Sequence, residues 1–147
     1  MDRFSYPTVT AEPSVDVNVS WSDTTKGRIT EVEMGSVVER YLRALVDHDW
    51  AALAECMADD VVRVGPFGDT YTPKGPYVTF LEELMPSLEG YSMKVDRIVE
   101  AGSVVVAELT ETLEIGGKVH VTPEALVFDL DADGRIAKVD IFIKRLA

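Results

Sequence analysis

Two adjacent glycines near the carboxyl end of the chain, Gly116 and Gly117, constrain its fold more than any other feature. They separate two segments with the pattern of strands, residues 103–115 and 118–130. Adjacent glycines favour a two-residue hairpin turn, because such turns require positive φ angles. The pattern therefore predicts an antiparallel hairpin of fixed register. Counting outward from the turn pairs Ile115 with Lys118, Leu113 with His120, Glu111 with Thr122, and Leu109 with Glu124.

This register assigns each hairpin side chain to one of two faces. We expect helices to cover the face with the larger apolar groups, which carries Ala107, Leu109, Glu111, Leu113, His120, Thr122, Glu124, Leu126 and Phe128. A carboxylate drawn into such surroundings loses hydration, so its pKa rises and it can accept or donate a proton near neutral pH. Glu111, Glu124 and His120 are therefore candidate catalytic residues.

Several of these assignments have structural alternatives. A register error of one residue, for instance a bulge at Pro123, would turn Glu124 and His120 out to solvent. His48 lies in an Asp-His-Asp corner and fits a solvated loop residue. Cys56 lies in the apolar run LAECM and fits a small buried side chain better than a reactive thiol.

Helical patterns precede the hairpin. Thr30 and Glu33 fit a capping box at the start of a helix that runs to about Val46. Its apolar stripe consists of Val37, Val38, Tyr41, Leu42 and Leu45. Asp49 is the expected cap of a short helix over residues 50–57, and a third helix, within residues 77–90, should end at Pro86.

The remaining segments complete an α+β pattern, with helices first and an antiparallel meander after them. Alternating apolar residues predict an edge strand over residues 14–21, a strand that ends at Gly65, and strands over 92–100 and 135–146. Residues 66–76 are rich in turn formers and should form a loop. We expect a flexible arm over residues 1–13 and a single domain over 14–147.

Composition narrows the classes of partner. The formal net charge of -12 repels nucleic acid phosphates and anionic lipid headgroups, so neither nucleic acid nor membrane is an expected partner. One cysteine and the lack of a secretory signal favour the cytoplasm. The sequence has neither metal-ligand spacing nor a glycine-rich phosphate loop, so we expect no metal and no cofactor.

Several strings, taken in order, resemble the NTF2-like superfamily, and within it the SnoaL-like and ketosteroid-isomerase-like proteins. They are VVERYLRAL at 37–45, HDW at 48–50, MADD at 57–60, GP at 65–66 and DGRI at 133–136. The resemblance covers about residues 32–146. It implies a conical half-barrel, in which a strongly curved, mainly antiparallel sheet wraps around three N-terminal helices.

The resemblance also implies a deep pocket for a small hydrophobic ligand and a homodimer through the outer face of the sheet. Members include isomerases, polyketide cyclases, dehydratases and epoxide hydrolases, so the fold alone does not decide the function. The residues expected to line the pocket are Met57, Arg63, Gly65, Leu109, Thr122, Leu126, Phe128 and Ile141.

The ketosteroid-isomerase pattern is only partly present. Tyr41 falls on the tyrosine that donates a hydrogen bond to the developing oxyanion, although it also fits an amphipathic core residue. The position of the general-base aspartate falls on Gly65. The position of the second, protonated acid falls on Leu126, or on Ala125 if Pro123 is the anchor.

The pattern of limonene-epoxide hydrolases is also incomplete. Its water-holding tyrosine and asparagine fall on Arg63 and Gly65. The arginine of its Asp-Arg-Asp triad falls on Leu109, the neighbouring aspartate on Glu111, and the remaining aspartate near Asp140 or Ile141. This register points Arg63 into the pocket, whereas simple alternation of Val62 and Val64 would point it outward.

The leading hypothesis is a SnoaL-like enzyme that isomerises, cyclises or dehydrates a small hydrophobic carbonyl compound by proton transfer. Glu124 or Glu111 would be the base, and Tyr41 with His120 would stabilise the oxyanion. A non-catalytic carrier or sensor that uses the same pocket is the first alternative. A structural or adaptor domain that pairs through the outer face of residues 138–144 is the second.

Overall fold

The computed structural model describes residues 19–20 and 34–144 of the chain. The predicted arm, most of the predicted edge strand and the capping box at Thr30 lie outside the described residues. The described elements are β1 (Val19–Ser20), α2 (Met34–Asp47), α3 (Trp50–Glu55), β2 (Met57–Val64), β3 (Thr70–Tyr71), α4 (Lys74–Leu84), the 3-10 helix η1 (Met85–Ser87), β4 (Glu89–Ala101), β5 (Val104–Ile115), β6 (Lys118–Leu130) and β7 (Ile136–Ile143).

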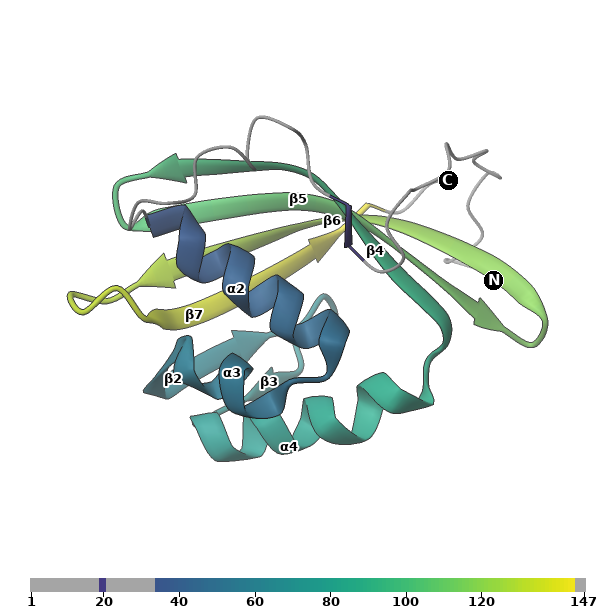
Figure 1. Ribbon diagram of the computed structural model, residues 1–147, viewed down its shortest axis with the longest axis horizontal. Coiled ribbons are helices and arrows are strands. Elements are labelled where there is room, and N and C mark those ends of the chain that lie inside the picture. The colour runs from purple at the N-terminus through teal and green to yellow at the C-terminus, as the bar shows by residue number, and fades with distance from the viewer. Residues whose placement is uncertain (1–18, 21–33, 145–147) are drawn as a thin grey trace.

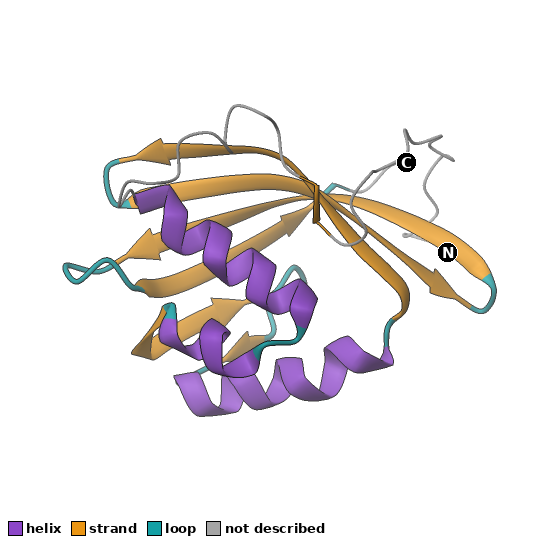
Figure 2. Cartoon of the chain, viewed as in Figure 1, coloured by secondary structure: helices purple, strands orange, loops and turns teal. Residues whose placement is uncertain are grey.

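The strands form one curved sheet in the order β1-β4-β5-β6-β7-β2-β3. The pairs β1/β4 and β2/β7 are parallel, and the other pairs are antiparallel. Helices α2, α3 and α4 cover the concave face of this sheet, as Figures 1 and 2 show. The expected α+β architecture, a strongly curved sheet wrapped around helices, is confirmed.

The β5–β6 hairpin has the predicted register in every pair from Ile115 and Lys118 to Leu109 and Glu124. The two turn glycines have φ angles of 60° and 80°, a conformation that side chains with a Cβ avoid. Pro123 pairs with Thr110 without a register shift, so the alternative with a bulge at Pro123 is wrong.

The boundary between α3 and β2 differs from the prediction of a helix over residues 50–57. Asp49 caps α3 as expected, because its Oδ1 accepts a hydrogen bond of 3.1 Å from the N–H of Ala52. The helix nevertheless ends at Glu55, and Met57 pairs with Ile136 as the first residue of β2. Pairing with β7 outweighs the helical pattern of this short segment.

Helix α4 begins at Lys74, inside the segment predicted to be a loop. Pro76 is tolerated there because the first turn of a helix needs no N–H donor. The helix ends at Leu84, and Pro86 lies in η1, which confirms the predicted stop.

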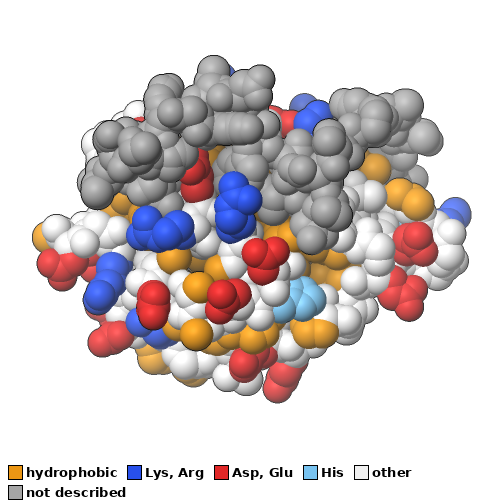
Figure 3. Space-filling view, in the orientation of Figure 1, with side chains coloured by type: hydrophobic (Ala, Val, Ile, Leu, Met, Phe, Trp, Pro, Cys, Tyr) orange, Lys and Arg blue, Asp and Glu red, His pale blue; other side chains and the backbone are white. Residues whose placement is uncertain are grey.

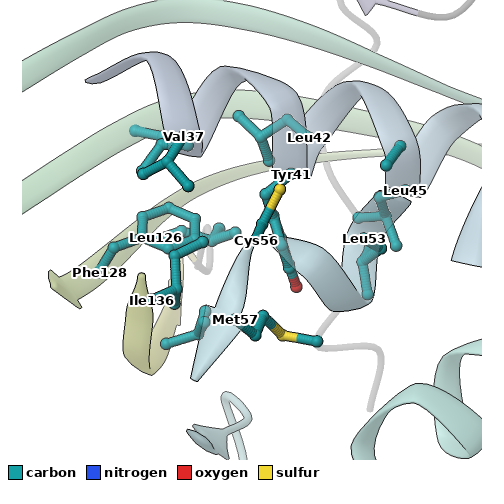
Figure 4. Close-up of a cluster of buried hydrophobic side chains, with 14 of the residues drawn as sticks. Val37, Tyr41, Leu42, Leu45, Leu53, Cys56, Met57, Leu126, Phe128 and Ile136 are labelled. Carbon is teal, nitrogen blue, oxygen red and sulfur yellow. The ribbon is translucent and has the colours of Figure 1, made fainter. Parts of the chain in front are cut away.

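The core lies between the helices and the concave face of the sheet (Figure 4). The predicted stripe of α2 is buried throughout, and Tyr41 packs edge-to-face on Phe128 of β6 with ring centroids 5.5 Å apart. Cys56 is buried, as expected. On the face seen in Figure 3, acidic, basic and hydrophobic side chains are interspersed. Among the described helices, none is long and apolar enough to cross a membrane.

Candidate functional site

Two carboxyl groups lie side by side on the concave face of the hairpin. Glu111 of β5 pairs with Thr122, and Glu124 of β6 pairs with Leu109, so the two acids occupy diagonal positions on one face. A hydrogen bond joins their side chains. On this face Leu109 and Leu126 are buried beside them. Both acids therefore lie on the predicted face beside apolar side chains, and each acid is itself half-buried.

The surroundings of Glu124 favour the protonated form of its carboxyl group. Burial raises the pKa of its carboxyl to about 11, and the charge of Glu111 and the hydrogen bond to it act in the same direction. The guanidinium of Arg63 opposes this rise but does not cancel it. A protonated carboxyl group at this position can donate a hydrogen bond.

Tyr91 of β4 is the third member of the site. Its hydroxyl donates a hydrogen bond to Oε2 of Glu111. Burial, and then the neighbouring charge of Glu111, raise the pKa of this phenol well above its usual value, so it stays a donor. Sequence reasoning missed Tyr91, although its alternation with Met93 and Val95 already indicated the buried face of a strand.

Tyr41 of α2 and Tyr77 of α4 meet through their hydroxyl groups, which are hydrogen-bonded to each other. Both side chains are buried. Burial raises the pKa of Tyr41 well above its usual value and that of Tyr77 to about 12. Tyr77 is a second residue that sequence reasoning missed, because only the packing of α4 against the interior reveals it.

Arg63 lies on the concave face of β2, in register with the buried Val139. Its side chain is 11% exposed, and its guanidinium carbon lies 4.9 Å from the ring centroid of Phe80. The inward orientation is the one that the family resemblance implies, and the outward one is wrong. Val62, Arg63 and Val64 pair in unbroken succession with Lys138, Val139 and Asp140, so alternation holds, and it is Val62 and Val64 that lie on the outer face.

The turn after β2 brings a further carboxylate to this region. Nη1 of Arg63 lies 3.1 Å from Oδ2 of Asp69. A Cβ atom built on Gly65 would lie 2.4 Å from Oδ1 of Asp69. The carboxylate of Asp69 therefore fills the space that a side chain at position 65 would occupy, a relationship that spacing along the sequence does not reveal.

The other predicted site residues divide by burial. Met57, Leu109, Leu126 and Phe128 are core residues, whereas Thr122, Ile141 and His120 are half-buried. His120 shares the face of Glu124 but lies nearer the turn, paired with Leu113. His48 is exposed and stacks on Trp50, which fits its expected place in a loop.

A groove of about 370 Å³ follows the sheet near Glu124. Its walls are Asp96, Glu108, Leu109, Pro123, Glu124, Ala125, Phe142, Ile143 and Lys144. Most of these residues alternate with the buried ones and therefore belong to the convex face. Among the described residues, no group of three or more His, Cys, Asp or Glu side chains is placed to hold a metal ion.

The sequence and the structure were compared with those of known proteins. The model of the SnoaL-like domain matches residues 38–139. No curated protein matches the chain significantly. An LEH-like epoxide hydrolase from M. tuberculosis is 26% identical, with a TM-score of 0.66 over 76% of this chain and 82% of that one.

Two further solved structures share the fold at lower identity. A candidate SnoaL-like polyketide cyclase from Shewanella denitrificans is 16% identical, with a TM-score of 0.67 over 76% of this chain and 90% of that one. A protein with a ketosteroid-isomerase-like fold from Catenulispora acidiphila, solved with trimethylamine, is 18% identical, with a TM-score of 0.64 over 72% and 83%.

Proposed function

The chain belongs to the SnoaL-like domain family, and from this premise we propose that it is an enzyme of cofactor-free proton transfer. Its substrate is a small hydrophobic carbonyl compound, which it isomerises, cyclises or dehydrates. The observation that carries the proposal is the hydrogen-bonded pair of Glu111 and Glu124 on the concave face, beside the buried Leu109 and Leu126. A half-buried carboxyl pair that holds one proton offers an acid and a base at the same place.

The proposed roles follow from the chemistry of each group. One carboxyl group removes a proton from the carbon next to the carbonyl group, and the other side chains stabilise the negative charge that develops on the carbonyl oxygen. Tyr41 and His120 are the proposed donors to this oxygen. The hydroxyl of Tyr41 is bonded to that of Tyr77, so Tyr77 supports it in this role.

Replacement of either carboxyl group tests the proposal. Glu111→Gln and Glu124→Gln should each lower proton exchange at least ~100-fold, because a positioned acid or base contributes a factor of about 10² or more. The measurement is deuterium incorporation from D₂O into a panel of hydrophobic ketones and 1,3-dicarbonyl compounds, followed by NMR.

The matched control is Glu108→Gln, since Glu108 is on the same strand but on the convex face, bonded to Arg97. This variant should keep the wild-type rate. Exchange that is equally fast in all three variants would refute a role for the buried pair in proton transfer.

A second candidate is a non-catalytic binder of a small apolar ligand at the same site. It is favoured by Gly65, Leu126 and Leu109, which stand where the resemblance places catalytic groups. A relative with the same fold has been solved with a small molecule, trimethylamine. A ligand that binds tightly and is recovered chemically unchanged after long incubation would support this candidate over the enzyme.

A further inference from the structure

The two carboxyl groups of the site are chemically equivalent as residues but differ in their surroundings. We infer that Tyr91 is the positioning residue that makes Glu111 the proton acceptor and leaves Glu124 as the proton donor of the pair. The inference rests on the proposed function, which requires an acid and a base but does not say which group is which.

The geometry of three adjacent strands carries this assignment. Tyr91 lies on β4 two residues before Met93, and Met93 pairs with Glu111 on β5. Because alternate residues of a strand share a face, Tyr91 and Met93 point toward the same side of the sheet as Glu111. Glu124 lies on the next strand, β6, beyond Glu111. The hydroxyl of Tyr91 therefore reaches Glu111, and its hydrogen bond is made to that carboxyl group.

The number of available hydrogen-bond donors then decides where the shared proton lies. An ionised carboxylate only accepts hydrogen bonds, whereas a protonated one can donate. With the proton on Glu124, Glu111 accepts from both Tyr91 and Glu124. With the proton on Glu111, the ionised Glu124 would accept from Glu111 but not from Tyr91, beside the apolar Leu109 and Leu126. The first arrangement satisfies the charge better, since hydrogen bonds to an ionised group are the stronger ones.

The other groups around the pair do not reverse this preference. Tyr41 from α2 and Tyr77 from α4 satisfy each other. Arg63 from β2 is paired with Asp69, and its charge opposes protonation of Glu124 without preventing it. From β7, Glu124 faces the apolar Ile143.

The remaining groups near Glu124 belong to its own strand, β6. His120 is on the same face of β6 as Glu124 but four residue pairs nearer the turn, and Thr122 lies between them on that face. The two carboxyl groups therefore differ in that Glu111 accepts a hydrogen bond from the hydroxyl of Tyr91.

This assignment gives a balanced first step. Glu111 takes a proton from the carbon next to the carbonyl group, and the electron pair of that C–H bond forms the C=C bond of the enol. As the C=O π bond breaks, the carbonyl oxygen receives the proton that Glu124 donates. The pair carries one negative charge before and after the step, now on Glu124. Return of both protons, with carbon protonated at a new position, completes an isomerisation.

Infrared spectroscopy of the carboxyl groups tests the assignment without any substrate. At pH 7, the wild-type protein should show a signal of a buried carboxylic acid that is lost in Glu124→Gln and kept in Glu111→Gln. Glu108→Gln should leave it unchanged, because Glu108 is on the other face. A signal lost in Glu111→Gln and kept in Glu124→Gln would overturn the assignment, as would the absence of any such signal in the wild type.

The variant Tyr91→Phe tests the part played by the hydroxyl. At pH 7, the carboxylic acid signal of Tyr91→Phe should differ in frequency and intensity from that of the wild type, because without the hydroxyl the proton is no longer held on Glu124 alone. An unchanged infrared signal in a folded Tyr91→Phe protein would contradict the inference. If the infrared pattern is as expected and no ketone exchanges, the assignment stands and the proposed enzymatic function fails.

Discussion

At the scale of single residues, the site consists of carboxyl and hydroxyl groups, which are costly to remove from water unless they form hydrogen bonds. A neutral Glu124 avoids the large cost of a buried charge, and the hydroxyl groups of Tyr91, Tyr41 and Tyr77 each have a partner. The residue most sensitive to size is Gly65, which leaves room for the carboxylate that pairs with Arg63. The polar groups of the site are thus satisfied by one another.

Gly65→Ala should destabilise the protein by about 1 kcal/mol, because its Cβ would displace the partly exposed carboxylate of Asp69 and break its ion pair with Arg63. Chemical denaturation of the variant measures this loss. Gly75→Ala is the matched control, since nothing lies within 4 Å of a Cβ there. Alanine at Gly75 gains helix propensity in the first turn of α4 but precedes Pro76, whose ring crowds a Cβ there, so we expect a smaller change in stability than at Gly65. Equal stability of the two variants would show that Asp69 does not depend on the space at Gly65.

At the scale of elements, local chemistry decided which features could be predicted from the sequence. The Gly116-Gly117 turn fixes the register of β5 and β6 by counting, so the positions of Glu111 and Glu124 followed from sequence alone. The α3–β2 boundary was wrong by two residues, and the start of α4 by three. The first error arises because Met57 pairs with the distant Ile136. The second arises because a proline in the first turn of a helix gives the same sequence signal as a loop.

The turn itself provides a prediction at this scale. Gly117→Val should cost about 1–2 kcal/mol, because Gly117 has a φ angle of 80° and a β-branched residue is strained in this region. Gly117→Asn should cost less, since asparagine tolerates positive φ. Denaturation midpoints of the two variants compare these costs directly. If valine and asparagine are tolerated equally, the turn does not hold the register.

At the scale of the whole molecule, the site gathers side chains from α2, α4, β2, β4, β5 and β6 (Figure 1). The sequence could indicate the acids, which one hairpin brings together. The alternation of Tyr91 with Met93 and Val95 indicated the buried face of β4, but the contact of Tyr91 with Glu111 depends on a β4–β5 pairing with two register shifts that counting does not foresee. Tyr77 and Asp69 depend on the packing of α4 and on the turn after β2. Contacts between residues far apart in the sequence were therefore the part of the site that the sequence could not predict.

The convex face of the sheet supports the proposal of a homodimer. Phe142 is 54% exposed and Val119 is 63% exposed, and Phe142 borders the groove near Pro123 and Ala125. Phe142→Glu should convert a dimer into a monomer by placing a charge in the apolar contact, with little loss of helix signal in circular dichroism. Light scattering measures the mass. A wild-type protein that is monomeric would remove this proposal.

The proton balance of folding tests the central claim, that the half-buried Glu124 is a neutral acid at neutral pH. Its folded pKa of about 11 lies above the unfolded value near 4.5, so the unfolded chain binds fewer protons between these limits. Stability should be greatest below about pH 4.5 for this group and should fall as pH rises, by up to about 1.4 kcal/mol per pH unit.

The decisive measurement is the melting temperature from pH 5 to pH 9 of the wild type, Glu124→Gln and Glu108→Gln. Wild type and Glu108→Gln should lose stability steeply with rising pH, whereas Glu124→Gln should lose much less and be the most stable at pH 9. Parallel curves for the wild type and Glu124→Gln would contradict the burial of a neutral Glu124 and the chemistry built on it.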